Sequence, residues 1–327
     1  MAGSYFDGKV VLVTGGTGSF GNRFVARVIK DHNPEKVVVF SRDELKQSEM
    51  AKRITDPRVR FLLGDIRDLP RLRRAFHDVD VVVHAAALKQ VPALEYNPFE
   101  AVQTNIIGAE NIINAAIDES VERVIALSTD KAVNPTNLYG ATKLCFEKLF
   151  VAGNNYAGGT KTRFSCVRYG NVVGSRGSVV PLFLEKRRGG VLPITHKDMT
   201  RFWITLDQSV DMVFYAANEM RGGEIFVPKI PSMKILDLAK AIAPDCRLEF
   251  VGVRPGEKLH EALLTDEESG RTVDAGNCFV IKPQVHWWPI GNWNGSKAVP
   301  TGFRYTSDAN DTWLTTKDIT AMVDAVS

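Results

Sequence analysis

Short, Val-rich apolar runs alternate with amphipathic stretches through the first half of the chain. Six such runs occur, at residues 10–13, 36–40, 59–63, 80–84, 121–127 and 164–168. Because they are continuously apolar, they are typical of strands buried on both faces of a parallel sheet. The stretches between them have helical periodicity, most clearly at residues 20–30, 44–54 and 99–118. The pattern predicts repeated βαβ units and therefore an α/β fold with a doubly wound parallel sheet.

The pattern changes at about residue 171. Beyond this point Gly and Pro become frequent, the helical stretches shorten, and only weak strands are indicated, at residues 224–227 and 248–251. We therefore expect residues 1–170 to form a Rossmann domain to which some later segments return. Residues 171–327 should form mainly a smaller lobe that binds the substrate.

Composition narrows the class of protein. The 327 residues are 44% hydrophobic and 24% charged, and the net charge is only +3. A balance this even gives no reason to expect a nucleic-acid or membrane-surface partner. The first residues are polar and resemble no signal peptide, and no apolar run approaches the roughly 20 residues that span a bilayer. We expect a cytoplasmic protein.

The cysteines and a Trp-rich segment near the C-terminus have no predicted functional role. The four cysteines have neither metal-ligand spacing nor a Cys-x-x-Cys pair, and are Cys145, Cys166, Cys246 and Cys278. We expect ordinary buried thiols and no metal site. The segment 287–303 is rich in Trp, Gly and Asn, and we assign it no role.

A glycine-rich loop, Gly15-x-x-Gly18-x-x-Gly21, follows the first predicted strand and opens the first predicted helix. In that context the three glycines allow a tight turn, a close approach to a pyrophosphate, and close helix–strand packing. The helix N-terminus adds free N–H groups and a positive dipole end. A glycine-rich turn without a ligand is the alternative. The full loop, with Thr17, Ser19 and Phe20, predicts a dinucleotide site.

The end of the second predicted strand bears on which dinucleotide is bound. Ser41 lies 20 residues after Gly21, where an NAD enzyme would carry an acidic residue, and Arg42 follows it. A hydroxyl and a guanidinium suit a 2′-phosphate, so NADP is favoured over NAD. Asp43 leaves NAD open. Further cofactor contacts are expected from strand ends and nearby helices, at Lys46, Asp65, Ile66, Ala85, Ala86 and Val172.

Tyr139 and Lys143 form a Tyr-x-x-x-Lys pair after the fifth predicted strand. The i, i+4 spacing puts both side chains on one helix face. An ammonium at Lys143 would favour the Tyr139 phenolate and hydrogen-bond the nicotinamide ribose. Tyr139 could then move a proton while a hydride moves to or from the nicotinamide. The pair therefore predicts a hydride-transferring enzyme.

The chain resembles a family within the extended short-chain dehydrogenases/reductases, the inverting UDP-N-acetylglucosamine 4,6-dehydratases. The resemblance covers nearly the whole chain. It rests on seven motifs: Thr14-Gly-Gly-Thr-Gly-Ser-Phe-Gly21, Ser41-Arg-Asp-Glu-Leu-Lys46, Ser128-Thr-Asp-Lys-Ala-Val-Asn-Pro135, Tyr139-Gly-Ala-Thr-Lys143, Arg168-Tyr-Gly-Asn-Val-Val173, Met199-Thr-Arg-Phe-Trp-Ile-Thr205 and Arg254-Pro-Gly-Glu-Lys258. It implies a homo-oligomer, such as a hexamer, that makes the first intermediate of pseudaminic acid or related bacterial sugars.

Thr129-Asp130-Lys131 is the most specific part of the resemblance. After oxidation at C4 of the sugar, the ketone acidifies the C5 hydrogen. Lys131, as a neutral amine, could remove that proton, and a protonated Asp130 could protonate the departing 6-hydroxyl. Both roles require shifted pKa values, lowered for Lys131 and raised for Asp130. A surface ion pair after a strand is the alternative.

The resemblance also implies a substrate site for UDP-N-acetylglucosamine. Its members are Lys89, Asn171, Thr195, Arg201, Arg254 and Glu257. Arg254 and Arg201 suit a diphosphate, while Glu257 could accept hydrogen bonds from hydroxyls. Tyr139 favours the inverting branch, because the membrane-bound retaining relatives commonly have Met at this position.

Three alternatives stay open at this point. A UDP-sugar 4-epimerase would need Tyr139 and the cofactor but no elimination pair. A retaining 4,6-dehydratase would keep the C5 configuration. A catalytically silent, NADP-binding regulatory protein would have no need of Tyr139, Lys143, Asp130 and Lys131 together.

Overall fold

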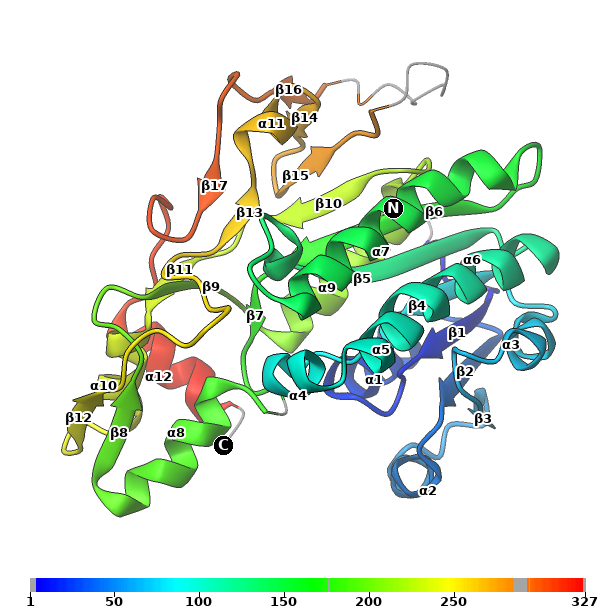
Figure 1. The fold of residues 1–327 in the computed structure, drawn as a ribbon. Helices are drawn as coiled ribbons and strands as arrows, with labels where there is room; N and C mark the ends of the chain where they lie inside the picture. Colours follow the sequence, from blue (N-terminus) through cyan, green and yellow to red (C-terminus); the bar gives the residue numbers. More distant parts are fainter. Residues whose placement is uncertain (1–3, 176, 285–292, 294, 326–327) are drawn as a thin grey trace.

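The computed structural model describes residues 4–175, 177–284, 293 and 295–325. Its centre is a sheet in which seven neighbouring strands run parallel, in the order β10-β6-β5-β4-β1-β2-β3 (Figure 1). Their bounds are Val10–Thr14 (β1), Lys36–Ser41 (β2), Val59–Leu63 (β3), Val81–His84 (β4), Arg123–Thr129 (β5), Arg163–Tyr169 (β6) and Ile225–Pro228 (β10). The prediction of a doubly wound α/β fold is confirmed.

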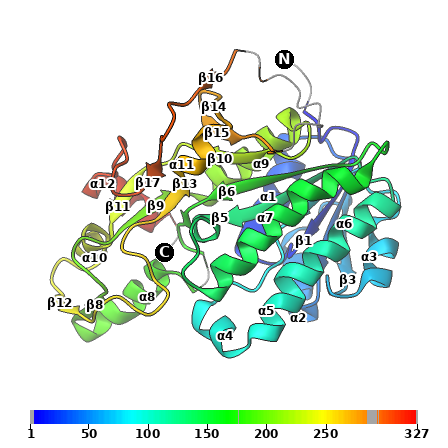
Figure 2. The same ribbon diagram turned by 45° about the horizontal axis from the view of Figure 1, so that its top comes forward.

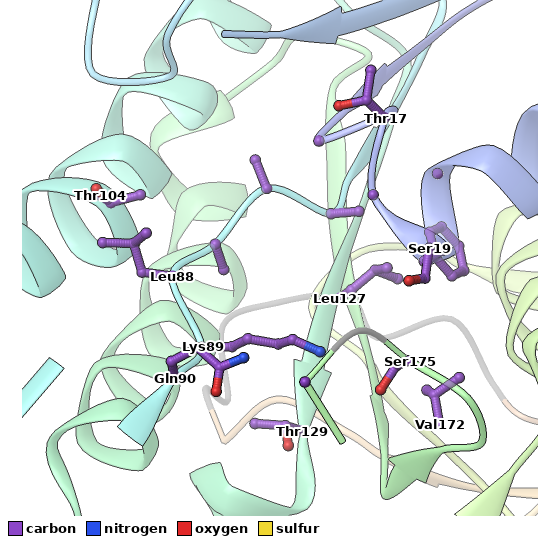
Figure 3. Close-up of a pocket in the computed structure, with 18 of the residues that line it drawn as sticks. Thr17, Ser19, Leu88, Lys89, Gln90, Thr104, Leu127, Thr129, Val172 and Ser175 are labelled. Carbon is purple, nitrogen blue, oxygen red and sulfur yellow. The ribbon is translucent and has the colours of Figure 1, made fainter. Parts of the chain in front are cut away.

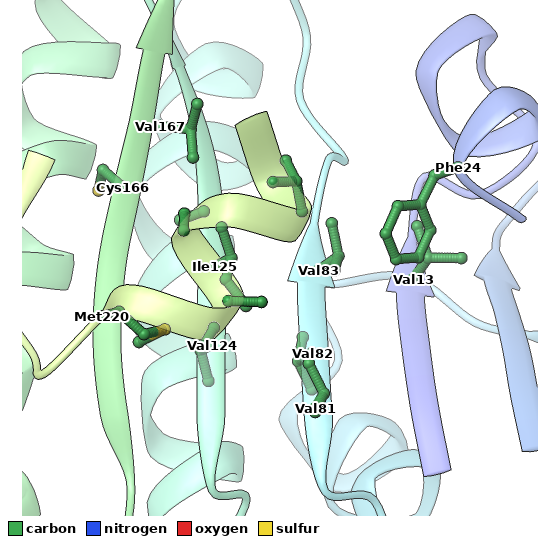
Figure 4. Packing of buried hydrophobic residues seen from close by; sticks show 14 of the residues in the cluster. Val13, Phe24, Val81, Val82, Val83, Val124, Ile125, Cys166, Val167 and Met220 are labelled. Carbon is green, nitrogen blue, oxygen red and sulfur yellow. The ribbon is translucent and has the colours of Figure 1, made fainter. Parts of the chain in front are cut away.

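Helices cover both faces of this sheet. One face carries α3 (Leu69–Phe76), α6 (Gly108–Asp118) and α7 (Leu138–Ala157), and the other carries α1 (Ser19–Asp31) and α9 (Leu206–Glu219). Figure 4 shows Phe24 of α1 beside Val13, with Met220 at the end of α9 near Val124. Strands buried on both sides have no need of polar alternation, which explains their continuous apolar runs.

The helix predicted over residues 99–118 is interrupted. The chain forms α5 (Pro98–Val102), then a π-helical turn, η1 (Gln103–Ile107), and then α6. The turn places the buried Asn105 amide against the loop after β4, where it accepts from Leu88 N and donates to Leu88 O, both at 2.9 Å. It also donates to Thr142 Oγ1 on α7 at 3.1 Å. A π-helical turn that forms for such a contact cannot be recognised from the spacing of apolar residues, so the sequence pattern did not predict it.

Part of the second half returns to the large sheet. Strand β15 (Cys278–Ile281) pairs antiparallel with β10, β14 (Thr272–Asp274) pairs with β15, and β16 (Lys297–Ala298) pairs with β14. Trp293 packs on Phe226, with 5.7 Å between ring centroids. The rest of the Trp-rich segment up to residue 294 lies outside the described residues.

A second apolar core lies at one end of the molecule (Figures 1 and 2). Its helices are α8 (Val179–Lys186), α10 (Ile235–Ile242) and α12 (Thr316–Asp324). Two small sheets accompany them, formed by β7 (Asn171–Val172), β9 (Thr200–Ile204) and β11 (Ser232–Lys234), and by β8 (Val191–Ile194) and β12 (Arg247–Phe250). A third small sheet, formed by β13 (Ala262–Leu264) and β17 (Tyr305–Thr306), packs on the first core.

Candidate active site

A cavity of about 630 Å³ follows the carboxyl ends of the parallel strands. Its wall includes every residue that the sequence suggested for the cofactor. They are Gly15, Thr17, Gly18, Ser19, Phe20, Gly21, Ser41, Arg42, Asp43, Lys46, Asp65, Ile66, Ala85, Ala86, Tyr139, Lys143 and Val172. The carboxyl ends of the strands in an open α/β sheet are the usual place for a ligand.

Two glycines of the loop after β1 are required by the geometry. Gly15 has φ +64°, and a Cβ there would lie 2.9 Å from Ala86 Cα. A Cβ at Gly21 would overlap the backbone of Gly16. The helix α1 then begins at Ser19, with Gly18 at its N-cap and no side-chain cap among the described residues. The loop is therefore shaped to admit an anion at the N-terminus of a 13-residue helix.

Two cations lie at the end of β2, each beside a carboxylate. Arg42 is 54% exposed, and its Nη1 lies 3.5 Å from Asp65 Oδ2. Lys46 forms an ion pair with Asp43. Ser41 is buried and accepts a hydrogen bond from Thr17 Oγ1 at 3.2 Å. The predicted hydroxyl and guanidinium therefore lie together at this end of the cavity.

The proposed elimination residues lie in a short turn at the end of β5. Thr129 ends β5, and Asp130–Ala132 forms the 3₁₀ turn η2. Asp130 Oδ1 accepts from Thr129 Oγ1 at 2.9 Å and from Lys131 Nζ at 3.0 Å. Asp130 is fully buried, lines neither of the two cavities described here, and its Oδ2 has no hydrogen-bond partner among the described residues. Asp130 therefore lies behind Lys131, which does line the cavity.

The predicted neutral amine at Lys131 is wrong for the unliganded protein. Burial alone would lower the pKa of Lys131, but the negative charges of Asp130 and Glu261 outweigh burial and raise it. Glu261 Oε1 lies 3.6 Å from Lys131 Nζ. Lys89 has the lowered pKa instead, because the surrounding cavity wall partly removes it from water and the charge of Lys131 repels its own. In Figure 3 its side chain extends across the cavity from the loop after β4.

Tyr139 and Lys143 both face the first cavity, as predicted for one helix face. Burial raises the pKa of Tyr139 to about 12, opposed by the charge of Lys131. Burial lowers the pKa of Lys143 to about 7, and its Nζ donates to Leu127 O at 2.6 Å. In the unliganded protein the charge that lowers the pKa of Tyr139 is that of Lys131, and the expected stabilisation of its phenolate by a Lys143 ammonium stays a prediction.

A second cavity, also about 630 Å³, adjoins the first. Five of the six predicted substrate residues line it, namely Asn171, Thr195, Arg201, Arg254 and Glu257. Lys131 and Asn171 line both cavities, whereas Lys89 lines only the first. Asn171 Oδ1 and Glu257 Oε2 are buried without a hydrogen-bond partner among the described residues. Such atoms are costly unless a ligand satisfies them, so they fit a site for a hydroxyl-rich molecule.

Arg201 lies in the wall of the second cavity, but its guanidinium already has protein partners. Its Nη1 donates to Thr200 O at 2.7 Å and Leu259 O at 3.1 Å, and its Nη2 donates to Lys258 O at 3.0 Å. The side chain holds the backbone that precedes β13. The structure thus gives Arg201 a supporting role beside the diphosphate contact that the sequence suggested.

The sequence interpretation missed Glu261. This residue is 3% exposed and lines the second cavity. It follows the Arg254-Pro-Gly-Glu-Lys258 motif by three residues, but a single carboxylate there has no pattern that separates it from a surface charge. Its contact with Lys131 depends on two segments that are 130 residues apart in the chain, and only the fold brings them together.

Two other observations concern the described part of the chain. No three His, Cys, Asp or Glu side chains there are grouped as a metal site would require. None of the helices described is both long and apolar enough to span a bilayer.

The chain is similar to proteins of sugar metabolism. It is 49% identical to an inverting UDP-N-acetylglucosamine 4,6-dehydratase of Campylobacter jejuni, over 97% of this chain and 98% of the relative. It is 43% identical to a UDP-glucose 4-epimerase of Rickettsia canadensis, over 84% and 83%. The X-ray structure of Pen from Bacillus thuringiensis has 36% identity, covers 98% of both chains, and superposes with a TM-score of 0.91.

The sequence profile of a single family spans most of the chain. It is described as that of a polysaccharide biosynthesis protein and matches residues 11–283. This range includes the glycine loop, the turn that carries Lys131, the helix α7 and both cavities. The chain belongs to the polysaccharide biosynthesis protein family.

Proposed function

We propose that this protein is an inverting UDP-N-acetylglucosamine 4,6-dehydratase that uses NADP. One observation carries the proposal: Lys131, backed by Asp130, lies in the wall shared by the cavity at the glycine loop and a second cavity lined by Arg254 and Glu257. A sugar placed between the two cavities would have its reacting carbons beside Tyr139 and Lys131. The similarity to the Campylobacter jejuni enzyme supports this substrate.

Tyr139 and Lys131 can carry out all the proton transfers of the reaction. Tyr139 accepts the proton of the 4-hydroxyl as C4 is oxidised. Lys131, once neutral, removes the C5 hydrogen and passes that proton to the 6-hydroxyl, which leaves as water. Tyr139 returns its proton to C5 from the opposite face, which inverts that centre. A bound nicotinamide supplies the hydride acceptor for C4 and the hydride donor for C6, so the overall reaction is the loss of one water.

Asp130 acts through Lys131 in this scheme. Its carboxylate is buried behind Lys131 Nζ, at 3.0 Å, and does not reach either cavity wall. It therefore stabilises the Lys131 ammonium of the unliganded protein, and Lys131 has to lose its proton before it can act on C5. The sequence assigned protonation of the 6-hydroxyl to Asp130; because Asp130 lines neither cavity, the proposal gives this step to Lys131.

NADP is proposed over NAD because of the charges at the end of β2. Arg42 and Lys46 are both in the cavity wall. Each already has one carboxylate partner, at Asp65 and Asp43. A 2′-phosphate placed here would meet two cations and the Ser41 hydroxyl, whereas a ribose 2′-hydroxyl would need only one of the carboxylates.

Incubation with UDP-N-acetylglucosamine and NADP in D₂O, followed by NMR, tests the proposal. The expected product is the 4-keto-6-deoxy sugar with deuterium at C5 and L-arabino configuration. A D-xylo product would contradict inversion and favour the retaining reaction. Conversion to the C4 isomer alone would identify a 4-epimerase, the activity named for the Rickettsia relative.

A further inference from the structure

Glu261 presents a buried carboxylate to three cations. It directly precedes β13, and its side chain reaches across the second cavity toward η2. Its Oε1 lies 3.6 Å from Lys131 Nζ and 3.9 Å from Arg201 Nε, while its Oε2 lies 3.5 Å from Lys258 Nζ. Of these three cations, Lys131 is the one that also lines the first cavity.

The backbone around Glu261 is held on both sides. Glu261 N donates to Ser307 Oγ at 2.9 Å, and Ser307 N donates to Glu261 O at 2.8 Å. Arg201 binds the carbonyl oxygens of Lys258 and Leu259 just before it. The backbone that carries Glu261 is thus fixed, and its side chain is nearly inaccessible to water. Burying a carboxylate costs free energy unless a cation pairs with it, so we expect Glu261 to pair with one of the three cations.

Two of the three cations have other partners of their own. Lys258 donates to Val133 O, and Arg201 donates to three backbone carbonyls. Lys131 has only carboxylates around its amine among the contacts described, Asp130 at 3.0 Å and Glu261 at 3.6 Å. Only the contact with Asp130 is a hydrogen bond, so two N–H groups of the ammonium are left for ligands in the cavities.

We propose that Glu261 is a positioning residue for Lys131: its carboxylate holds the amine in the wall shared by the two cavities and sets how readily that amine gives up its proton. The catalytic consequence rests on the proposed dehydratase function, but the coupling between the two side chains does not. The raised pKa of Lys131, where the two carboxylates outweigh burial, agrees with this role.

The charged and titratable groups facing this pair come from every element packed around it. They are Asp130 on η2, Lys89 after β4, Tyr139 on α7, Arg201 on β9 and Lys258 before β13. Without the charge of Glu261, Lys131 would keep one carboxylate while the charges of Arg201, Lys258 and Lys89 remained. Its pKa should then fall.

The protonation of Lys131 can be followed without any turnover. Its side chain is 27% exposed, so a small acylating reagent can reach it from the cavities. We would measure acetylation of Lys131 by acetic anhydride against pH in the full-length protein, by peptide mass spectrometry. The midpoint in Glu261→Gln should fall by about one pH unit or more. The control is Glu122→Gln, which removes a partly buried partner of Lys9 (2.7 Å) at the opposite end of β5 and should leave the midpoint unchanged.

Two further measurements separate the possible outcomes. Glu261→Asp withdraws the charge by one methylene, so it should give a smaller shift in the same direction, and it replaces the Gln variant if that variant does not fold. The acid limb of kcat against pH should move to lower pH together with the acetylation midpoint. An unmoved midpoint in the folded variants overturns the proposal, because a purely structural Glu261 would lower kcat without moving either curve. A moved midpoint in a protein whose wild type makes no 4-keto sugar would uphold the coupling and reject the dehydratase function.

Discussion

The backbone carbonyl oxygen of Lys131 occupies the space that a side chain at Gly140 would need. The first turn of α7 therefore packs directly on η2, and this contact sets the distance between Tyr139 and Lys131. Asn137 caps the same turn by accepting from Gly140 N at 2.8 Å. Glycine at position 140 is thus part of the catalytic geometry, although it has no side chain.

Gly140→Ala should lower both stability and activity. The added methyl group forces η2 and α7 apart, which costs about 1–3 kcal/mol of unfolding free energy. The displacement of Lys131 should lower kcat by about 100-fold, since ångström-scale errors at reacting groups have effects of this order. Urea unfolding and turnover of UDP-N-acetylglucosamine measure the two effects. Gly159→Ala, at a position open to solvent, is the control. Normal stability and turnover in Gly140→Ala would show that the contact is not needed.

Gly15→Ala should weaken cofactor binding beyond what backbone strain explains. Gly15 combines φ +64° with a close approach to Ala86. Gly8 has a similar φ of +70° with nothing within 4 Å of an added Cβ. Both variants should lose about 1–2 kcal/mol of stability from strain. In a titration with NADPH, only Gly15→Ala should show a raised Kd. Equal Kd values in the two variants would contradict the proposed pyrophosphate loop.

Arg42→Ala should shift the cofactor preference toward NAD. Loss of a charge-assisted contact to the 2′-phosphate corresponds to about 1.5–3 kcal/mol, or roughly 10- to 100-fold in the ratio of Kd values. Titrations with NADP and NAD give this ratio directly. Lys52→Ala, an exposed change on the neighbouring helix α2 (Glu44–Arg53), should leave it unaltered. An unchanged ratio in Arg42→Ala would remove the argument for NADP.

Lys143→Met should stabilise the protein in a pH-dependent way. Burial lowers the pKa of Lys143 from 10.5 to about 7. Between these values the unfolded chain binds a proton that the folded protein does not, so this group makes stability rise with pH. Below pH 7 the folded protein carries the full cost of the buried charge, on the order of a few kcal/mol. The gain from Met should therefore be largest at low pH and vanish near pH 10.5.

Unfolding by urea at several pH values tests this expectation. Lys148→Met changes an exposed lysine on the same helix and should show no such trend. Lys143→Met should also lose activity, because the amine lines the cofactor cavity. A stability gain that grows with pH would contradict the assigned burial effect.

The sequence predicted the structure best where the conformation depends on a single local segment. The six apolar runs fall on β1 to β6 within two residues at each end. Burial on both faces explains the runs in the inner strands, whereas β3 is an edge strand with Arg60 and Leu63 exposed. The glycine spacing likewise reflects a local loop geometry, so Gly15 and Gly21 could be read from the chain alone. The weak strands expected at 224–227 and 248–251 form β10 and β12, each offset by one residue.

It was least informative where segments distant in the chain meet. The charge on Lys131 depends on Glu261, and the neutral amine at Lys143 depends on how deeply α7 is buried. Neither relation has a local pattern. The π turn at Gln103–Ile107 is another example, since it exists for contacts of Asn105 with Leu88 and Thr142.

The position of β10 has a consequence for how the protein is made. Strand β6 ends at Tyr169, but its outer neighbour β10 begins only at Ile225, and the strands beyond β10 come later still. A growing chain that has emerged up to β6 would present an unpaired, apolar sheet edge until more than 50 further residues follow. The second half of the chain is therefore also the cover that protects the first half from aggregation during synthesis.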